Sequence, residues 1–368
     1  MMFYINYPAT KGALENKGLR KVAFFFLLFS FLPLFSQSDT IRYCIAFYNV
    51  ENLFDPEKDP EKNDDAFTPA GFYRWTYKRL YKKLNDIAKV LLAINAWEPP
   101  DIVGLAEVEN ANVLKKLCYA TGLKAYHYRY VHYDSPDARG IDVALLYRKD
   151  RIQIIESYPV PVVFPFEPNS KNRDILYAKA LIIGDTLARL VPDTLHLFVN
   201  HWTSRFGGHG ATIPKRNYYA QVLRKQVDSL LFINSSAYII IMGDFNDYPS
   251  DESMLTYLQA KNYKHEKEQG TLFNLMFPLM DGKNTGTHKS QEFWGCLDQF
   301  IVSKSLLNNE TRWQIENREA IIFDAPFLLT PDEKYGGVKT FRTYLGPKYL
   351  GGYSDHLPIK IILHSIKK

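Results

Sequence analysis

The stretch Tyr238–Asp247 reads YIIIMGDFND and combines a structural pattern with a chemical one. Its first half is a short, almost wholly apolar run rich in β-branched residues, which is typical of a buried strand. Asp244 and Asn246 follow directly where that strand is expected to end. Because α/β proteins commonly build their sites at strand ends, we interpret this stretch as a core strand that presents functional side chains.

The same pattern, an apolar strand followed by polar groups, recurs along the chain. It is found at Asn49–Asn52, Glu107–Asn110, Asn200–Trp202, Leu297–Asp298 and Ser354–His356. Each segment alone has an ordinary explanation, because a carboxylate after a strand often caps a helix or forms a turn. A lone histidine is likewise more often structural than catalytic. The recurrence of the pattern within one chain is what indicates a shared site.

The order of the predicted elements indicates the fold. Helices are expected at Tyr73–Trp97, Ala111–Ala120, Lys215–Leu231 and Glu252–Ala260. Strands are expected at Ile41–Asn49, Asp101–Glu107, Tyr126–Tyr133, Ile141–Arg148, Arg151–Ser157, Leu176–Ile183, Thr194–Asn200, Tyr238–Asp244, Leu297–Ser303 and Leu357–Leu363. Strand–helix–strand units alternate with long meanders of strands. This order favours an α/β fold in which two mixed sheets pack face to face between outer helices, a four-layer α-β-β-α sandwich.

The amino-terminal segment 1–37 has the features of a signal peptide. Its apolar run ends in small polar residues and follows the basic residues Lys17, Arg20 and Lys21. The run, Val22–Phe35, is shorter than the roughly 20 residues of a comfortable membrane span. We therefore expect export to the periplasm, the cell surface or the medium, with a short uncleaved anchor as the alternative. Residues 38–368 contain no linker or repeat and are expected to form one domain without a stable membrane span.

The composition limits the choice of partners. Hydrophobic residues make up 46% of the chain and charged residues 23%, an ordinary globular balance. The net charge is +5, but segment 1–37 contributes +3 (four basic residues against one acidic), so the remainder carries about +2. A basic footprint for nucleic acid therefore has to be local, and no protein partner is evident. The cysteines, Cys44, Cys118 and Cys296, have apolar neighbours and are expected to be buried free thiols.

The side chains at the predicted strand ends suit a hard divalent cation. Carboxylate and amide oxygens are the ligands that Mg²⁺, Mn²⁺ and Ca²⁺ prefer, whereas the sequence lacks the cysteine clusters and HExxH pattern typical of zinc. His201 and His356 add groups that titrate near neutral pH and can move protons. Carboxylates for a metal and histidines for proton transfer are the equipment for metal-assisted phosphoester hydrolysis.

Taken in chain order, these segments resemble the endonuclease/exonuclease/phosphatase family. GDFN of the opening stretch, LDQF from Leu297 and SDHLP from Ser354 match its motifs, and the resemblance extends from about Tyr43 to Pro358. The opening FYNVENLFD, which starts at Phe47, and the closing GGYSDHLP are most similar to the subgroup of predicted extracellular nucleases. The resemblance implies a divalent-metal-dependent phosphoesterase, with Mg²⁺ as the expected ion and Mn²⁺ or Ca²⁺ as alternatives.

The resemblance also implies roles at the metal and the substrate. Glu107 matches the principal metal-binding glutamate, and Asp355 matches an aspartate near the metal. Asn49 matches an asparagine close to both the metal and the scissile phosphate. Arg173, in the segment NRDI, resembles an arginine that contacts the phosphate, for which a planar guanidinium is well shaped.

The remaining matches imply catalytic roles. His201 matches a position that faces the phosphate and acts as an acid. Asp244 and Asn246 match the pair that orients the attacking water and the phosphate. Asp298 matches the aspartate that supports the last histidine, His356, on the phosphate or proton path. A buried carboxylate beside a histidine fixes its tautomer and stabilises its cationic form.

Some neighbouring residues have two interpretations. Asp142 either supports His201 or is an ordinary strand residue, and Arg205 either holds a phosphate or belongs to a turn. The segment 334–353 interleaves basic residues with aromatic residues and glycines. It either follows a phosphate backbone and stacks on bases, or packs as a surface loop.

These observations favour an exported endonuclease that cleaves DNA, with RNA as a further substrate. A phosphatase or phosphodiesterase acting on a lipid head group or a phosphorylated small molecule is the alternative, because the same metal and water machinery serves both. An open groove would favour the first and a closed pocket the second. A non-catalytic binding protein on the same fold is disfavoured, because every matched position is intact. The sequence leaves endo- versus exo-cleavage and the oligomeric state open.

Overall fold

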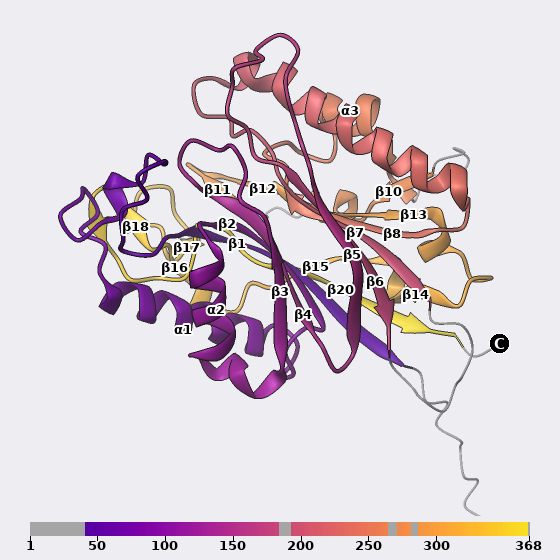
Figure 1. Cartoon of the computed structure of the whole chain (residues 1–368), viewed down its shortest axis with the longest axis horizontal. Coiled ribbons are helices and arrows are strands. Elements are labelled where there is room, and N and C mark those ends of the chain that lie inside the picture. Colours follow the sequence, from indigo (N-terminus) through magenta and orange to yellow (C-terminus); the bar gives the residue numbers. More distant parts are fainter. Residues whose placement is uncertain (1–40, 184–192, 264–270, 281–285, 367–368) are drawn as a thin grey trace, which may run out of the picture. The chain divides into compact units, whose positions relative to one another are not determined.

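The computed structural model describes residues 41–183, 193–263, 271–280 and 286–366 (Figure 1). The expected signal peptide, residues 1–37, lies outside these ranges. None of the helices within them is long and apolar enough to cross a membrane. All three cysteines are buried free thiols, as predicted.

The first large sheet brings the first and last strands of the described chain side by side. In spatial order its strands are β14 (Trp313–Ile315), β20 (Ile359–Ser365), β1 (Arg42–Leu53), β2 (Ile102–Val108), β4 (Asp142–Arg148) and β3 (Tyr128–His132), with β15 (Ile321–Ile322) also paired to β20. β1 and β2 run parallel, so their carboxyl ends lie at the same edge. The other neighbours in this sheet are antiparallel.

The second large sheet contains the YIIIMGD strand in its middle. Its spatial order is β5 (Ile152–Val160), β6 (Ile175–Ile182), β7 (Thr194–His201), β8 (Tyr238–Asp244), β13 (Asp298–Ser303), β10 (Leu272–Asn274) and β9 (Ala260–Lys261). β7 and β8 are parallel, and β13 is antiparallel to β8. The carboxyl ends of β7 and β8 therefore meet the amino end of β13 at one edge.

Apolar side chains fill the spaces between four layers. Alternate residues of β1 point to opposite faces of the sheet. Phe47 therefore joins the cluster between the two sheets, while Tyr48 joins the cluster beneath the helices α1 (Tyr77–Ala93) and α2 (Ala111–Tyr119). A third cluster lies beneath α3 (His209–Ile233). Figure 1 shows α1 and α2 on one side of the sheets and α3 on the other. The predicted α-β-β-α sandwich is confirmed.

The two sheets approach each other closely behind the strand ends. A side chain at Gly104 of β2 would place its Cβ 2.7 Å from the Met242 sulfur of β8. Within the second sheet, a Cβ at Gly243 would lie 2.5 Å from the backbone oxygen of Asn200. Contacts shorter than 3 Å require a shift of structure, so glycine at both positions permits the close packing that brings the strand ends together.

The predicted helices differ from the observed ones mainly at their ends. α1 starts after Thr76, whose side chain accepts a hydrogen bond from the backbone N–H of Arg79. α3 starts at His209, earlier than expected, and contains Pro214 near its beginning. The last expected helix is a single π-helical turn, Ser253–Leu258.

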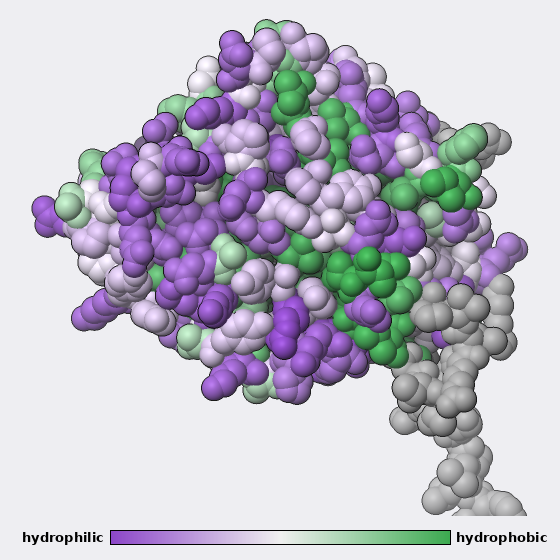
Figure 2. Space-filling view, viewed as in Figure 1, coloured by the Kyte–Doolittle hydropathy of each residue, from purple (hydrophilic) through white to green (hydrophobic). Residues whose placement is uncertain are grey.

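Three short hairpins were not predicted. They are β11 (His288–Ser290) with β12 (Phe293–Gly295), β16 (Leu329–Pro331) with β17 (Val338–Thr340), and β18 (Tyr344–Leu345) with β19 (Lys348–Tyr349). Strands of two or three residues carry too little alternation to be recognised. The face drawn in Figure 2 is a mixture of hydrophilic and hydrophobic residues, with hydrophobic residues gathered near β5.

Candidate active site

The ends of five strands and one loop converge at a single place. Register in the second sheet puts Asp244 at the end of β8 directly beside His201 of β7 on one side and Asp298 of β13 on the other. From the first sheet, Asn49 of β1 and Glu107 of β2 reach the same place. His356 comes from the loop before β20 and contacts Asp298.

Backbone irregularities aim the side chains of the first sheet. The pairing of β1 with β2 shifts register after Asn49, and that of β2 with β4 shifts near Glu107. Glu51, Asn52 and Glu107 all have positive φ angles, of 53°, 53° and 64°. Non-glycine residues rarely adopt this conformation, and such strain concentrates at functional sites. The bulges redirect these strand ends into the site.

Asn49 connects the two sheets through its side chain. Its Nδ2 donates to Asp244 Oδ2 at 3.0 Å and to Glu107 Oε1 at 3.4 Å. The other carboxylate oxygen of Glu107 accepts from the backbone N–H of Asn52 at 2.8 Å. Asn246 is joined to this group through its backbone, whose N–H donates to Asp244 Oδ1 at 3.0 Å. Its side-chain Nδ2 donates to the Trp202 carbonyl.

The two histidines lie in different electrostatic surroundings. His356 Nδ1 is 2.7 Å from Asp298 Oδ2, and its Nε2 is 3.7 Å from Asp244 Oδ2. Burial alone would lower the pKa of His356, but the carboxylates of Asp298 and Asp244 outweigh it and hold that pKa well above its usual value. Burial, reinforced by the nearby Arg173, holds the pKa of His201 well below its usual value. His356 is therefore the cationic imidazole and His201 the neutral one.

Asp244 is a strongly perturbed carboxylate of the site. Burial raises its pKa to about 7, although His356 acts in the opposite direction. His201 Nε2 lies 3.8 Å from Asp244 Oδ2 and 4.0 Å from Glu107 Oε1, which is too long for hydrogen bonds. His201 Nδ1 and Asp298 Oδ1 are buried and make no hydrogen bond with the described residues. Buried polar atoms without a partner are rare in folded proteins, and both of these belong to the residues gathered around Asp244.

A buried network of charged groups supports Asp355. Arg342 donates to Asp355 Oδ2 at 2.7 Å and to Glu51 Oε1 at 3.4 Å. Glu51 Oε2 also accepts from the backbone N–H of Thr343 at 2.7 Å, and Lys83 of α1 donates to the Thr343 hydroxyl at 2.5 Å. Burial raises the pKa of Glu51 and lowers that of Lys83. This network fixes the loop that carries Arg342 and Asp355.

His288 is a further histidine at the site that the sequence patterns did not reveal. It belongs to β11, forms a backbone bridge with His356, and its ring centroid lies 4.8 Å from that of His356. Burial and the neighbouring His356 lower its pKa to about 4, so it is neutral. No apolar strand precedes it, and only the fold brings it here.

These groups border a cleft with a volume of about 580 Å³, within the roughly 300–1,000 Å³ range of ligand sites. Asn49 and Asp298 lie buried beneath it. The cleft is lined by Glu107, Arg139, His201, Arg205, Phe206, Asp244, Asn246, Tyr248, His288, Phe293, Arg342, Asp355 and His356, among others.

Arg173 is not brought into the cleft, which corrects the expected phosphate contact. Its guanidinium is buried, donating to the backbone carbonyls of His201 and Trp202 and to Asp137 Oδ2, each at 2.9 Å. It thus supports the end of β7 from below. Asp142 does not support His201 either, because it accepts hydrogen bonds from Ser135.

The segment 334–353 contributes to two short hairpins, and three of its tyrosines pack against the fold. Tyr344, Tyr349 and Tyr353 pack against the cluster beneath α1, and Lys339 pairs with Asp332. Only Arg342 of this segment lines the cleft. The structure therefore favours the packing interpretation, with one arginine as the exception.

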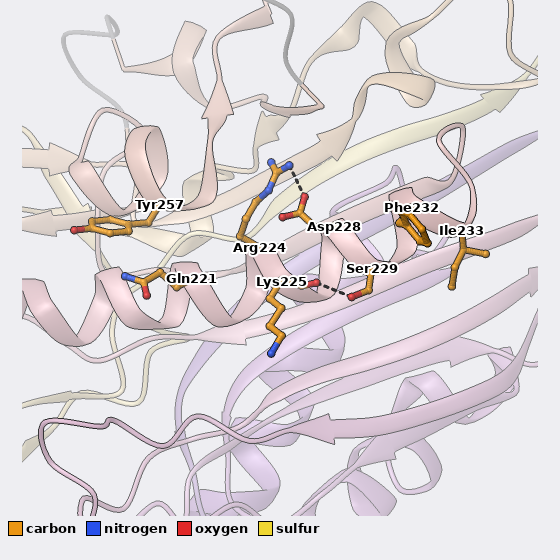
Figure 3. A pocket seen from close by; sticks show the side chains of 8 residues that line it. All are labelled: Gln221, Arg224, Lys225, Asp228, Ser229, Phe232, Ile233 and Tyr257. Carbon is orange, nitrogen blue, oxygen red and sulfur yellow. Dashed lines mark hydrogen bonds and ion pairs between the residues drawn. The ribbon is translucent and has the colours of Figure 1, made fainter.

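A second hollow, of about 670 Å³, runs along the solvent face of α3 (Figure 3). Arg224 pairs with Asp228 there at 2.6 Å, and the exposed rings and chains of Phe232 and Ile233 lie at one end. It contains none of the strand-end residues described above.

The donor chemistry of the cleft fits a divalent metal ion. Glu107 and Asp355 offer carboxylate oxygens, which suit a hard cation. Asn49, expected as a further ligand, instead turns its amide nitrogen toward Glu107, and its oxygen accepts from the backbone N–H of Glu51 at 3.0 Å. The ligand atoms of Asp244, Asp298 and His356 also lie within 4.8 Å of one another, as do those of His288, Asp355 and His356. Either of these two groups could therefore contribute further ligands to the ion.

Replacing Asp298 with asparagine is expected to lower the pKa of His356, because its closest carboxylate charge is removed. NMR titration of the imidazole protons in metal-free protein measures this directly. A folded-state pKa above the unfolded value of about 6.5 stabilises the fold below that pH, and the contribution is lost as pH rises through the folded pKa. The free energy of unfolding of the variant should therefore be reduced mainly below about pH 6.5, where the charged His356 stabilises the wild type fully. An unchanged His356 pKa would contradict the assigned pair.

Comparison with known proteins gives the same fold. A family model described as "Endonuclease/Exonuclease/phosphatase family" matches residues 44–365. A humanized D. rerio TDP2 superposes with a TM-score of 0.53 at 15% identity, covering 88% of this chain and 98% of that chain. The human Nocturnin catalytic domain with bound sulfate has a TM-score of 0.53 at 15% identity, covering 89% of this chain and 97% of that chain. A Bacteroides thetaiotaomicron mannosyl-6-phosphatase has a TM-score of 0.51 at 16% identity, covering 87% of this chain and 99% of that chain. A comparison with curated proteins gave no match.

Proposed function

The chain belongs to the endonuclease/exonuclease/phosphatase family and is a divalent-metal-dependent phosphoester hydrolase, and we propose that it is an exported endonuclease that cleaves nucleic acid with Mg²⁺. DNA is the first proposed substrate and RNA the second. The observation that carries the proposal is the arrangement of Asp244 between His201 and Asp298, facing a cleft of about 580 Å³ that arginines border. Arginine side chains beside such a site suit the phosphates of a nucleic-acid backbone.

The proposed division of labour follows from the geometry. Glu107 and Asp355 would hold the ion, which when bound neutralises charge on the phosphoryl oxygens, and Asn49 holds Glu107 in place through its amide nitrogen. Asp244, buried and with a pKa raised to about 7, accepts the proton of the attacking water. Asn246, held through its backbone to Asp244, is placed to orient that water.

The two histidines are proposed to donate hydrogen bonds to the substrate phosphate. Asp298 fixes the tautomer of His356 and keeps it cationic, so His356 Nε2 faces the phosphate as a hydrogen-bond donor. His201 is neutral and offers a polar donor next to Glu107 and Asp244. Preorganised donors of this kind stabilise the charge that develops on the phosphate.

The proposal is tested with a panel of substrates and metals. Single-stranded DNA, plasmid DNA, RNA and small phosphomonoesters are incubated with Mg²⁺, Mn²⁺, Ca²⁺ or EDTA. We expect polynucleotide cleavage with Mg²⁺, its loss with EDTA, and weaker cleavage as salt rises, because backbone contacts are screened. Survival of every polynucleotide while a phosphomonoester is hydrolysed would replace the nuclease with the phosphatase alternative.

Export is supported by the basic residues and the apolar run of segment 1–37. Amino-terminal sequencing of the protein recovered from periplasm, cell surface and medium tests it. A chain that keeps segment 1–37 and stays in the cytoplasm would contradict export.

A further inference from the structure

Two phenylalanine rings are exposed at the rim of the candidate active site. The exposed fraction is 92% for Phe206 and 66% for Phe293, and both line the same cleft as Asp244 and His356. Single exposed apolar residues are common on protein surfaces. Phe232 on α3, for example, is 93% exposed but lies in the hollow away from the site. It is the position of Phe206 and Phe293, beside the reacting groups, that calls for an explanation.

The residue before Phe206 ties this loop to the rest of the site. The preceding Arg205 donates from Nε to the Asn246 carbonyl at 2.7 Å and pairs with Asp251 at 2.8 Å. Its guanidinium also lies 4.3 Å from the centre of the Tyr248 ring. Arg205 is therefore committed to the loop after β8 and is not a free phosphate ligand. The consequence is that the loop carrying Phe206 is tied to the loop after β8.

Phe293 is anchored from a different element. It starts β12, pairs with Ser290 across the hairpin, and its hairpin partner strand bridges to His356 through His288. Lys289 of that strand pairs with the buried Asp332 at 2.9 Å. The hairpin is thus tied to the site and to the neighbouring loop, and it holds the Phe293 ring at the cleft.

Cations lie in the same cleft as the two rings. Arg139 lines it with a side chain that is half exposed, and Arg342 reaches it from the segment before Asp355. Exposed aromatic rings beside cationic side chains form the usual binding surface for single-stranded nucleic acid, where rings stack on bases and cations follow the phosphates. A lipid head group such as phosphocholine offers no planar base to stack on these rings.

We infer that Phe206 and Phe293 stack on the bases next to the scissile phosphate, which makes single-stranded nucleic acid the preferred substrate. The inference rests on the proposed nuclease function. Bases within a duplex already have both faces covered by their neighbours, so exposed rings can reach bases only in single strands, at ends or in opened regions. Loss of one stacking contact is expected to cost roughly ten- to one-hundred-fold in binding.

The test compares the Phe206→Ala, Phe293→Ala and double variants with Phe232→Ala as the matched exposed control. Each is assayed on a single-stranded oligonucleotide, on the same strand with abasic residues around the cleavage site, and on its duplex. We expect the wild type to prefer the single strand. The two cleft variants should lose roughly ten-fold or more in kcat/KM on it, chiefly through KM, and little on the abasic strand. Phe232→Ala should match the wild type.

The possible outcomes distinguish a failure of the stacking role from a failure of the proposed nuclease function. Equal losses on normal and abasic strands, no loss at all, or a preference for the duplex would overturn the stacking role while leaving the nuclease in place. A wild-type enzyme that leaves every oligonucleotide intact would overturn the proposed function, and the inference with it.

Discussion

Replacing Asp244 with asparagine is expected to lower kcat for phosphodiester hydrolysis by roughly 100- to 10,000-fold, the usual contribution of a general base. Asparagine keeps the shape of the side chain but cannot accept the proton. Asp244 is buried, its pKa is raised to about 7, and Asn49, His201 and His356 surround it. KM should change much less than kcat, because the group acts in the chemical step.

A neighbouring carboxylate provides the matched control for this variant. Asp247 is equally buried but pairs with Arg216 at 2.6 Å and accepts from Ser253, outside the cleft lining. Asp247→Asn should destabilise the fold while leaving kcat within a few-fold of the wild type. Steady-state kinetics and urea unfolding are measured on both variants. Equal losses of kcat in the two, or full turnover by Asp244→Asn, would rule out Asp244 as the base.

The sequence predicts the strand-end residues well because each lies next to its own structural marker. Asp244 follows an apolar run, and that run alone locates the end of the strand. The pairing that sets Asp244 beside His201 and Asp298 depends on register between strands far apart in the chain. Sequence patterns do not encode that register directly. The resemblance to a known family supplied it here.

The roles of residues that depend on tertiary contacts could not be predicted from the sequence. Lys83 lies on a helix and reads as an ordinary solvated lysine, yet it is buried against Thr343. Arg173 sits in a segment that resembles a phosphate contact, but folding directs its guanidinium to the carbonyls behind β7. A side chain with five donors serves backbone carbonyls as readily as phosphate. Only the fold decides between these uses.

Glu107→Gln is expected to weaken divalent-metal binding by at least the roughly 10- to 100-fold that loss of an outer-shell partner costs, because it removes a charged ligand. Activity at limiting Mg²⁺ should fall accordingly and recover in part at high Mg²⁺. Binding of Mn²⁺, followed by electron paramagnetic resonance, gives a readout that does not depend on turnover. The backbone at Glu107 is strained, with a φ of 64°, and its Oε2 accepts from Asn52, so the fold holds this carboxylate in place.

Glu109→Gln is the matched control, because it makes the same substitution at a carboxyl group that carries little charge at neutral pH. Glu109 lies two residues further on and is buried, and burial raises its pKa to about 8, so it is largely protonated at neutral pH. Glutamine imitates a protonated carboxyl, and Glu109→Gln should therefore bind Mn²⁺ like the wild type. If Glu107→Gln also bound Mn²⁺ with wild-type affinity, Glu107 would not be a ligand. The ion would then be sought at the group formed by Asp244, Asp298 and His356, in which case Asp244 could not be the proton acceptor, or at the group formed by His288, Asp355 and His356, which would leave Asp244 in that role.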